Sequence, residues 1–181
     1  MKYSDVEFVL KYGLQVRLVI EEDAEFIVAL RSDKRLSRFI NMTDPDVSKQ
    51  VEWIRAYKER EKEGKEYYFI FFINGVKIGL SRIYNIEDDH FTQGSWIFSP
   101  NAPVGSSVLG NIISCEFAFE LPNMRYLLTD ARKDNHTHKY IRSFHPEILC
   151  EDVLNIFYRI SKENYNKYKQ AHIRLCEMAM R

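Results

Sequence analysis

One stretch, "GSWIFSPNAPVGSSVLGNIISCEFAFE", carries residue types that can hold an anion. Apolar residues 96–98 are followed by a turn with two prolines and then by an apolar helix pattern that begins near Ser106. The N–H groups and the dipole at a helix start favour a phosphate or diphosphate without any basic side chain. Gly105 permits a close approach or a positive φ, and Ser106 and Ser107 can add hydroxyl donors. The pattern predicts a phosphate-binding loop over 102–108; an ordinary strand-to-helix connection is the alternative.

Two other segments carry side chains that can move protons at neutral pH. His138 and Tyr140 lie in "NHTHKYIRSFH", and His90 follows the acidic run 87–89. An unperturbed imidazole titrates near neutrality, so each histidine suits general acid–base chemistry. The acidic run offers further candidate bases, and a solvated turn is the alternative interpretation for it. These side chains are the candidates for proton transfer to or from a substrate.

The segment "RSDKRLSRFIN" places several arginines beside an aromatic ring and an amide. Arg31, Arg35 and Arg38 recur at intervals of four and three residues, and Phe39 and Asn41 follow them. Guanidinium groups bind phosphates bidentately and stack on aromatic rings, so this set suits a nucleotide diphosphate. The interpretation makes Arg31, Arg38 and Asn41 candidate substrate-binding residues; a solvated helix face is the alternative.

Hydrophobic periodicity predicts the elements that must position these residues. Asn74-Gly75 is a two-residue hairpin signature between two β-rich runs, and an acidic turn leads to a third strand. The predicted strands are 15–20, 66–73, 76–86, 91–98, 125–131 and 153–161; the predicted helices are 23–30, 34–39, 46–64, 106–119 and a short one from Asn135, with 162–181 as a short solvated helix or tail.

This order of elements predicts one domain over residues 1–181 with an α/β (α+β) fold. Three strands in succession favour antiparallel pairing, and the strand–helix–strand unit that follows favours a parallel pair. We therefore expect a mixed, mostly antiparallel sheet flanked by helices, with a β-α-β half that carries the phosphate-binding loop.

Composition narrows the classes of protein. The 181 residues include 26 Lys+Arg and 26 Asp+Glu, so the net charge of zero disfavours a nucleic-acid partner. The three cysteines, at 115, 150 and 176, form neither a disulfide framework nor a metal-binding motif, so no metal is expected. No apolar run approaches the roughly 18–20 residues of a membrane span, and the N-terminus lacks a signal-peptide pattern. We expect a cytoplasmic protein with no membrane span.

The order of elements and several short motifs resemble the GNAT acetyltransferases over about residues 15–160. Ala118-Phe119 matches a pair in RimL-like members, and this alignment places Gly105 and Ser107 at the two small positions of the family's Gln/Arg-x-x-Gly-x-Gly/Ala loop. "RKDN" matches the strand-to-helix junction before the family's Asn, which is Asn135 here. The resemblance implies acetyl-CoA as the acyl donor and the cofactor-binding residues Trp96, Ile97, Phe98, Val104, Gly105, Ser106, Ser107, Asn135 and Arg142.

One position departs from the pattern of this family. The family's general acid is usually a tyrosine seven residues after the Asn, but that position here is Arg142, which keeps its proton at physiological pH. Tyr140 lies about 200° around a regular helix from Arg142, and His138 lies four residues before it, on the same face. A thiolate is already a stable anion, so a strong acid is not required. Tyr140 and His138 are therefore the candidate acids, and His90 is a candidate base.

Longer phrases resemble a narrower group within this superfamily. "LRSDKRLSRFIN", "KQVEWIRAYKEREKEGKEYYFIF", "IGLSRIYNI" and "GSWIFSP" resemble amino-sugar N-acetyltransferases of surface-glycan pathways. That resemblance implies transfer of an acetyl group to the amine of a nucleotide-linked amino deoxy sugar. Two alternatives stay open: a RimL-like acetyltransferase of protein N-termini or other small amines, and a non-catalytic acyl-CoA-binding domain. The last strand also leaves open a homodimer formed by pairing of sheet edges.

Overall fold

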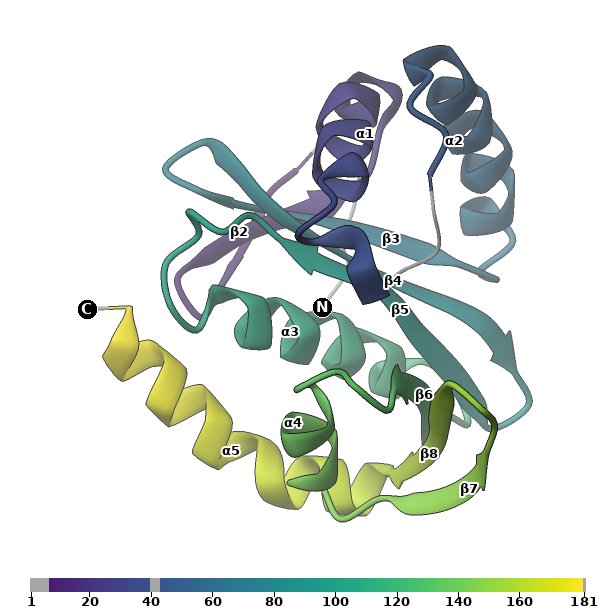
Figure 1. The fold of residues 1–181 in the computed structure, drawn as a ribbon, viewed down its shortest axis with the longest axis vertical. Helices are drawn as coiled ribbons and strands as arrows, with labels where there is room; N and C mark the ends of the chain where they lie inside the picture. Colours follow the sequence, from purple (N-terminus) through teal and green to yellow (C-terminus); the bar gives the residue numbers. More distant parts are fainter. Residues whose placement is uncertain (1–6, 40–42, 181) are drawn as a thin grey trace.

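Eight strands form one mixed sheet in the computed structural model, which describes residues 7–39 and 43–180 (Figure 1). Within this described part of the chain, the strand order is β1-β2-β3-β4-β5-β6-β8-β7, and β5 and β6 alone pair in parallel. The expected mixed, mostly antiparallel sheet is thereby confirmed. The strands are β1 (Val9–Lys11), β2 (Leu14–Leu18), β3 (Tyr67–Ile73), β4 (Val76–Glu87), β5 (His90–Phe98), β6 (Tyr126–Arg132), β7 (Glu147–Glu151) and β8 (Asn155–Ser161).

Helices cover both faces of the sheet because successive side chains of each strand point to opposite sides. Along β3, Tyr68 and Ile70 pack with the helices α1 (Ala24–Ser32) and α2 (Val47–Lys62). Phe69 and Phe71 pack instead with α3 (Ser106–Glu120). The helix α5 (Lys162–Ala179) lies beside α3 on that second face, and the short helix α4 (His138–Arg142) lies near it (Figure 1). Two cores result, one on each face of the sheet.

The structure differs from the sequence prediction mainly at the edges of the sheet and at the end of the chain. The sequence does not predict the strands β1 and β7, because both are short strands at the edges of the sheet. All five residues of β7 are exposed, so β7 shows no alternation of buried and exposed residues. The last segment, expected as a short solvated helix or tail, forms the 18-residue helix α5. Its residues Tyr165 and Ile173 are buried in the same core as α3. Charged residues separate these apolar positions, so their helical period is weak in the sequence.

Two predicted helical segments are shorter than expected. Between residues 34 and 39 the chain forms one 3-10 turn, η2 (Ser37–Phe39). The helix α4 begins at His138, not at Asn135. The side chain of Asn135 instead accepts a hydrogen bond of 3.0 Å from the Thr137 N–H and makes a turn before the helix. The N-terminus of α2 agrees with the prediction, since the Asp46 carboxylate accepts the Ser48 N–H at 2.8 Å.

The strands β5 and β6 pair over three residues and then separate. Parallel pairs join residues 90–92 to residues 126–128, and no pair follows them along the two strands. Ser95 has a φ of 47°, and the register between β4 and β5 shifts beside it. A bulge of this kind bends the strand that carries it. The second half of β5 therefore leaves β6 and opens a gap in the sheet.

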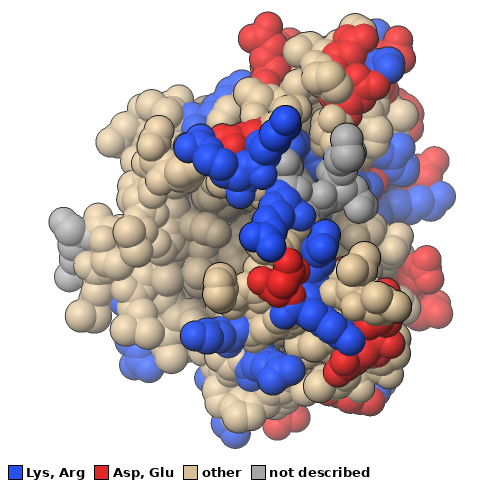
Figure 2. Space-filling view, viewed as in Figure 1, with Lys and Arg blue, Asp and Glu red and all other residues tan. Residues whose placement is uncertain are grey.

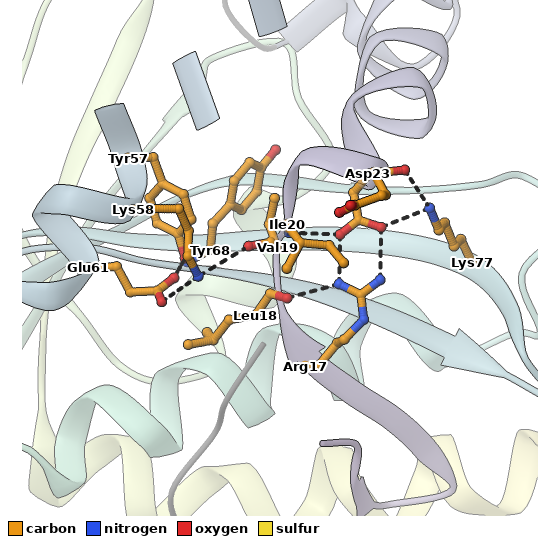
Figure 3. Close-up of polar contacts among 11 residues, drawn as sticks. Arg17, Leu18, Val19, Ile20, Asp23, Tyr57, Lys58, Glu61, Tyr68 and Lys77 are labelled. Atoms are coloured by element: carbon orange, nitrogen blue, oxygen red, sulfur yellow. Dashed lines mark hydrogen bonds and ion pairs between the residues drawn. The ribbon is translucent and has the colours of Figure 1, made fainter. Parts of the chain in front are cut away.

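A buried ion pair fastens the start of α1 to the sheet (Figure 3). The Arg17 guanidinium on β2 donates to both carboxylate oxygens of Asp23, at 2.6 and 2.9 Å, and Asp23 is fully buried. The Lys77 ammonium on β4 lies 2.8 Å from the same carboxylate, which also accepts the Ile20 N–H at 2.9 Å. Asp23 ends the 3-10 turn η1 (Glu21–Asp23), so this carboxylate sets where α1 begins.

A second polar contact fastens α2 to β3, as Figure 3 also shows. The Tyr57 hydroxyl accepts the Tyr68 backbone N–H at 2.9 Å and donates to Glu61. The Lys58 ammonium lies 2.6 Å from the other Glu61 oxygen. These bonds hold α2 over the strand, with the Trp53 and Tyr57 rings stacked parallel at 5.8 Å.

The partners of Asp23 determine its titration. Burial by itself raises the pKa of this carboxyl, but the hydrogen bonds from Arg17, Lys77 and the Ile20 N–H outweigh burial and hold the pKa below its usual value. A depressed folded-state pKa means that ionised Asp23 stabilises the fold above the unfolded-state pKa of about 3.9. That contribution is lost as the pH falls through the lower folded-state pKa.

We predict that Asp23→Asn lowers the free energy of unfolding by about 3–5 kcal/mol, because it leaves the Arg17 guanidinium buried without its counter-ion. Urea unfolding at pH 7 measures this loss. Between about pH 4 and pH 2 the variant should also lose less stability than the parent protein. Glu21→Gln is the matched control, since it breaks only the solvent-exposed pair with Arg55 and should leave the stability nearly unchanged. Equal losses in the two variants would contradict the role of Asp23.

Candidate active site

The gap between β5 and β6 opens into a cavity of about 550 Å³. Ser107 and Asn111 of α3 line it from one face of the sheet, and Arg31 of α1 lines it from the other. Figure 2 shows Lys and Arg side chains gathered across the middle of the face seen in Figure 1, beside a hollow of mostly uncharged side chains. The cavity therefore joins the two sides of the sheet at the point where strand pairing stops.

One edge of the cavity is the backbone of β5. The Ser99 N–H, just after the strand, donates to the Ile78 carbonyl on β4 at 2.8 Å. Backbone groups alternate between the two edges of a strand, so the N–H groups of Phe98 and Trp96 face the gap instead. The Trp96 indole N–H donates to the Ser107 carbonyl at 2.8 Å and ties this strand to α3. Trp96, Ile97 and Phe98, the three cofactor-binding candidates on β5, all line the cavity.

The N-terminus of α3 presents backbone N–H groups without partners. Its N-cap residue is Gly105, which has a φ of 95° and no side chain that could cap the helix. The Ser106 N–H donates to the Pro103 carbonyl at 3.1 Å. The N–H groups of Ser107 and Val108 have no hydrogen-bond partner among the described residues. A helix start with free N–H groups favours an anion.

The side chains of this loop lie in different environments. Ser107 is half-buried and lines the cavity. Ser106 is fully buried, and its hydroxyl lies 4.0 Å from the Met180 sulfur, so it faces α5 and not the cavity. Val104 is 77% exposed. The loop thus offers backbone groups more than the two predicted hydroxyls.

Tyr140 lies at the cavity, packed against β5 and α3. Its ring centroid is 5.3 Å from that of Trp96, and its hydroxyl donates to the Asn111 side-chain oxygen at 2.9 Å. Burial raises the pKa of Tyr140 well above its usual value, so the hydroxyl keeps its proton. Asn111 is 4% exposed and escaped the sequence analysis. Its signal in the sequence is a polar residue one helical turn after Ser107, within an otherwise apolar pattern.

His138 and Arg142 share α4 with Tyr140 but do not line the cavity. Both ring nitrogens of His138 have partners, the Tyr158 hydroxyl at 2.8 Å and the Arg132 carbonyl at 2.7 Å. Arg142 is exposed, and its Nε lies 3.5 Å from the same Tyr158 hydroxyl. Asn135, by contrast, lines the cavity. The short helix thus turns Tyr140 inward and Arg142 outward.

His90 and the acidic run before it lie at the other end of β5. The His90 Nδ1 atom is 3.5 Å from an Asp89 carboxylate oxygen in the β4–β5 hairpin. Six residues separate His90 from Trp96, which corresponds to about 20 Å along a strand. Asp130 on β6 is the one acidic side chain among the described residues that line the cavity. Asp130 is exposed on the side of the cavity that opens to solvent; partial loss of water around its carboxyl, with the nearby negative charge of Asp152, raises its pKa.

The arginine cluster divides between the cavity and the surface. Arg31 donates to the Ser95 hydroxyl at 2.9 Å and to the Thr43 hydroxyl at 2.5 Å, and it lines the cavity. Arg38 is exposed and pairs with Asp134 at 3.0 Å, which links η2 to the β6–α4 loop. Asn41 lies outside the described residues. Two further arginines that line the cavity were missed by sequence analysis: Arg82 and Arg132.

We predict that Gly105→Ala destabilises the protein by about 2–4 kcal/mol, because a positive φ strains alanine and the added Cβ overpacks its surroundings. That Cβ would lie 3.0 Å from the Cys176 Cα and 3.1 Å from its carbonyl oxygen on α5. Thermal unfolding with calorimetric enthalpies measures the loss.

Gly75→Ala is the matched control for this substitution. Gly75 has a φ of 76°, but an added Cβ there meets nothing within 4 Å. Only the backbone strain remains, so the expected loss is about 1 kcal/mol. If both variants lose the same stability, the close approach of α5 to the start of α3 is not what requires glycine.

Residues 14–141 match the family model for the acetyltransferase (GNAT) domain, so the chain belongs to the GNAT acetyltransferases. Its structure is similar to that of apo FdhC, a nucleotide-linked sugar GNAT, with 30% sequence identity, a TM-score of 0.81, and 96% of this chain and 98% of that chain covered. No curated protein matches this chain significantly.

Two further solved structures share the fold at lower identity. RimJ of Mycobacterium smegmatis in complex with CoA-disulfide has 14% identity and a TM-score of 0.71, with 91% of this chain and 92% of that chain covered. RimL, a ribosomal alpha-N-protein acetyltransferase in complex with coenzyme A, has 12% identity and a TM-score of 0.70, with 86% and 98% covered. These likenesses show the fold alone.

The family defines the chain as an acetyltransferase that uses acetyl-CoA and an acceptor substrate. The free N–H groups of α3 and the unpaired edge of β5 fit a ligand that carries a diphosphate and an amide-containing arm. Within residues 7–39 and 43–180, none of the helices has the length and the apolar character that crossing a membrane requires.

Proposed function

We propose that the protein transfers the acetyl group of acetyl-CoA to the primary amine of a nucleotide-linked amino deoxy sugar. The observation that carries this proposal is the cavity itself, which joins the free edge of β5 to a set of three arginines and one carboxylate. These side chains are Arg31, Arg82, Arg132 and Asp130. Arg82 pairs with Glu66, so Arg31 and Arg132 are the guanidinium groups of this set that suit an acceptor that carries phosphates. The likeness to a nucleotide-linked sugar GNAT at 30% identity supports the same substrate class.

The proposed cofactor site uses the α3 side of the cavity. The N–H groups of Ser107 and Val108 would hold the diphosphate, next to the loop that contains Val104 and Gly105. The Trp96 and Phe98 N–H groups would bind the amide-containing arm as an added strand does. Acetyl-CoA supplies an activated acyl carbonyl and a thiol leaving group. The Ser106 hydroxyl and the Arg142 guanidinium lie outside this proposed site.

Two side chains of the protein would act on protons during the reaction: Asp130 on the acceptor amine and Tyr140 on the leaving sulfur. Asp130 faces the cavity and would hold the acceptor amine and take up its proton. A sugar amine beside hydroxyl groups is less basic than a lysine, whose pKa is about 10.4, so a carboxylate is an adequate base. The Tyr140 hydroxyl donates its one proton to Asn111 in this structure, and it would turn that proton from Asn111 to the sulfur that leaves. Cytoplasmic synthesis of surface polysaccharide is the process in which we place this reaction.

We predict release of free thiol when the purified protein is mixed with acetyl-CoA and UDP- or dTDP-linked amino sugars. The assay follows thiol formation and the mass of the acetylated sugar. Turnover with peptide N-termini alone would contradict the sugar proposal and favour the RimL-like alternative. Tight binding of CoA without turnover of any amine would favour a non-catalytic acyl-CoA-binding domain.

We further predict that Tyr140→Phe and Asp130→Asn each lower kcat by about 10²-fold, the usual size of one acid–base contribution. The two variants should differ in pH dependence. The activity of the parent protein should rise with pH as Asp130 ionises, over a range displaced upward by its raised pKa. Tyr140→Phe should keep this rise, whereas Asp130→Asn should lose it.

Two conservative substitutions outside the cavity provide the controls. Glu147→Gln removes an exposed carboxylate from the edge strand β7, where it pairs with Arg159, and Tyr168→Phe removes a hydroxyl from α5, where its ring packs on His145 at 4.5 Å. Both should leave kcat within about 2-fold of the parent protein, since neither residue lines the cavity. A pH profile that Asp130→Asn leaves unchanged would rule out Asp130 as the base.

A further inference from the structure

A second cavity, of about 290 Å³, lies on the α1 and α2 face of the sheet beside the first. The two cavities share three lining residues, Arg31, Arg82 and Ser95, so they are neighbours. Ser95 directly precedes Trp96, whose backbone borders the proposed cofactor site. A group held in the second cavity would therefore sit next to the point of acyl transfer.

Two polar side chains, Gln50 and Tyr68, line this second cavity. Gln50 on α2 is 9% exposed, and its side-chain amide makes no hydrogen bond to the described residues. Tyr68 on β3 is 2% exposed and lines the same cavity, where its hydroxyl lies near the Arg31 guanidinium. The Gln50 amide opens onto the cavity and has no partner there in the part of the chain that the structure describes, so it is available to bond a ligand. Ile27 and Trp53 add apolar surface to the same cavity.

The charges around the second cavity are largely compensated within the protein. The Lys49 ammonium lies 2.5 Å from the Asp44 carboxylate at the rim. The Arg82 guanidinium lies 2.5 Å from a Glu66 carboxylate oxygen and packs over the Trp53 ring at 5.0 Å. Arg31 donates to the Thr43 and Ser95 hydroxyls. Two of these three cations, Lys49 and Arg82, therefore have carboxylate partners, and beside those two an uncharged group with hydroxyls is favoured over a phosphate.

We infer that the second cavity is the subsite for the sugar ring of the acceptor, with the Gln50 amide bonded to a ring hydroxyl. An amide both donates and accepts hydrogen bonds, as a hydroxyl does, and the apolar surface suits the C–H face of the ring. Pockets for whole small ligands usually have volumes of about 300–1,000 Å³, so this cavity holds one part of a larger acceptor. The inference rests on the proposed function, because it assumes an amino-sugar acceptor.

The test compares the affinity of the parent protein and Gln50→Leu for a nucleotide-linked amino sugar, by calorimetry in the presence of CoA. We expect Gln50→Leu to weaken this affinity by about 10-fold or more, as loss of one hydrogen bond in a closed site does. The affinity for UDP or dTDP without the sugar should change by less than about 2-fold, and so should that for CoA. Gln170→Leu makes the same substitution at an exposed position of α5 and should leave every affinity unchanged.

Gln50→Glu keeps the size of the side chain and removes its donors, so it serves as the second variant if Gln50→Leu unfolds. Weaker binding of the nucleotide sugar with unchanged binding of the nucleotide supports the inference. Equal affinity of parent and variant for the nucleotide sugar overturns it while the proposed function stands. An equal loss for the bare nucleotide also overturns it, because the nucleotide would then occupy this cavity. Failure of the parent protein to bind any amino-sugar nucleotide overturns both proposals.

Discussion

The separation of β5 from β6 is the constraint on which the rest of the site depends. Three parallel pairs hold the strands together, and the bulge at Ser95 then turns β5 away. A strand in the middle of a sheet normally has both edges paired, and unpaired backbone groups need water or a ligand as partners. In the proposed function, the unpaired edge of β5 binds the cofactor arm, and the gap connects the two faces of the sheet. It brings side chains from both helical layers to one cavity.

Each side of this gap is held by a different set of contacts. On the α3 side, the Trp96 indole bonds to the start of α3 and the Tyr140 hydroxyl bonds to Asn111, so β5, α3 and α4 form one wall. On the other side, the buried Asp23 carboxylate fixes the start of α1, which carries Arg31 at its last turn. Acyl transfer depends on placing two reactants within a fraction of an ångström, which rigid elements do better than loops.

The close packing of α5 on the start of α3 explains the composition of the loop before α3. One glycine, at position 105, is required there, because the φ is positive and α5 leaves no room for a Cβ. The remaining loop positions can carry ordinary side chains, since the proposed cofactor site uses N–H groups and not side chains of this loop. This accounts for a loop that has few glycines and still exposes the two N–H groups of Ser107 and Val108.

Local patterns made much of the fold predictable. A few neighbouring residues are enough to predict the Asn74-Gly75 turn, the Asp46 cap and the apolar periods of α2 and α3. The structure agrees with each of these predictions. The edge strands β1 and β7 and the helix α5 were missed or underestimated, because their apolar positions are few or separated by charges. Their structure comes from partners that are distant in the sequence.

The candidate site divides in the same way. The sequence by itself determined the strand–loop–helix that frames the cavity, and with it Trp96, Gly105 and Ser107, because backbone N–H geometry follows from local structure. Only the tertiary structure decided that Tyr140 points inward while His138 and Arg142 do not, and that His90 lies at the far end of β5. It also brought Asn111, Asp130 and Gln50 to the cavities. The physical reason is that side-chain direction and burial are set by packing between elements, which no local pattern encodes.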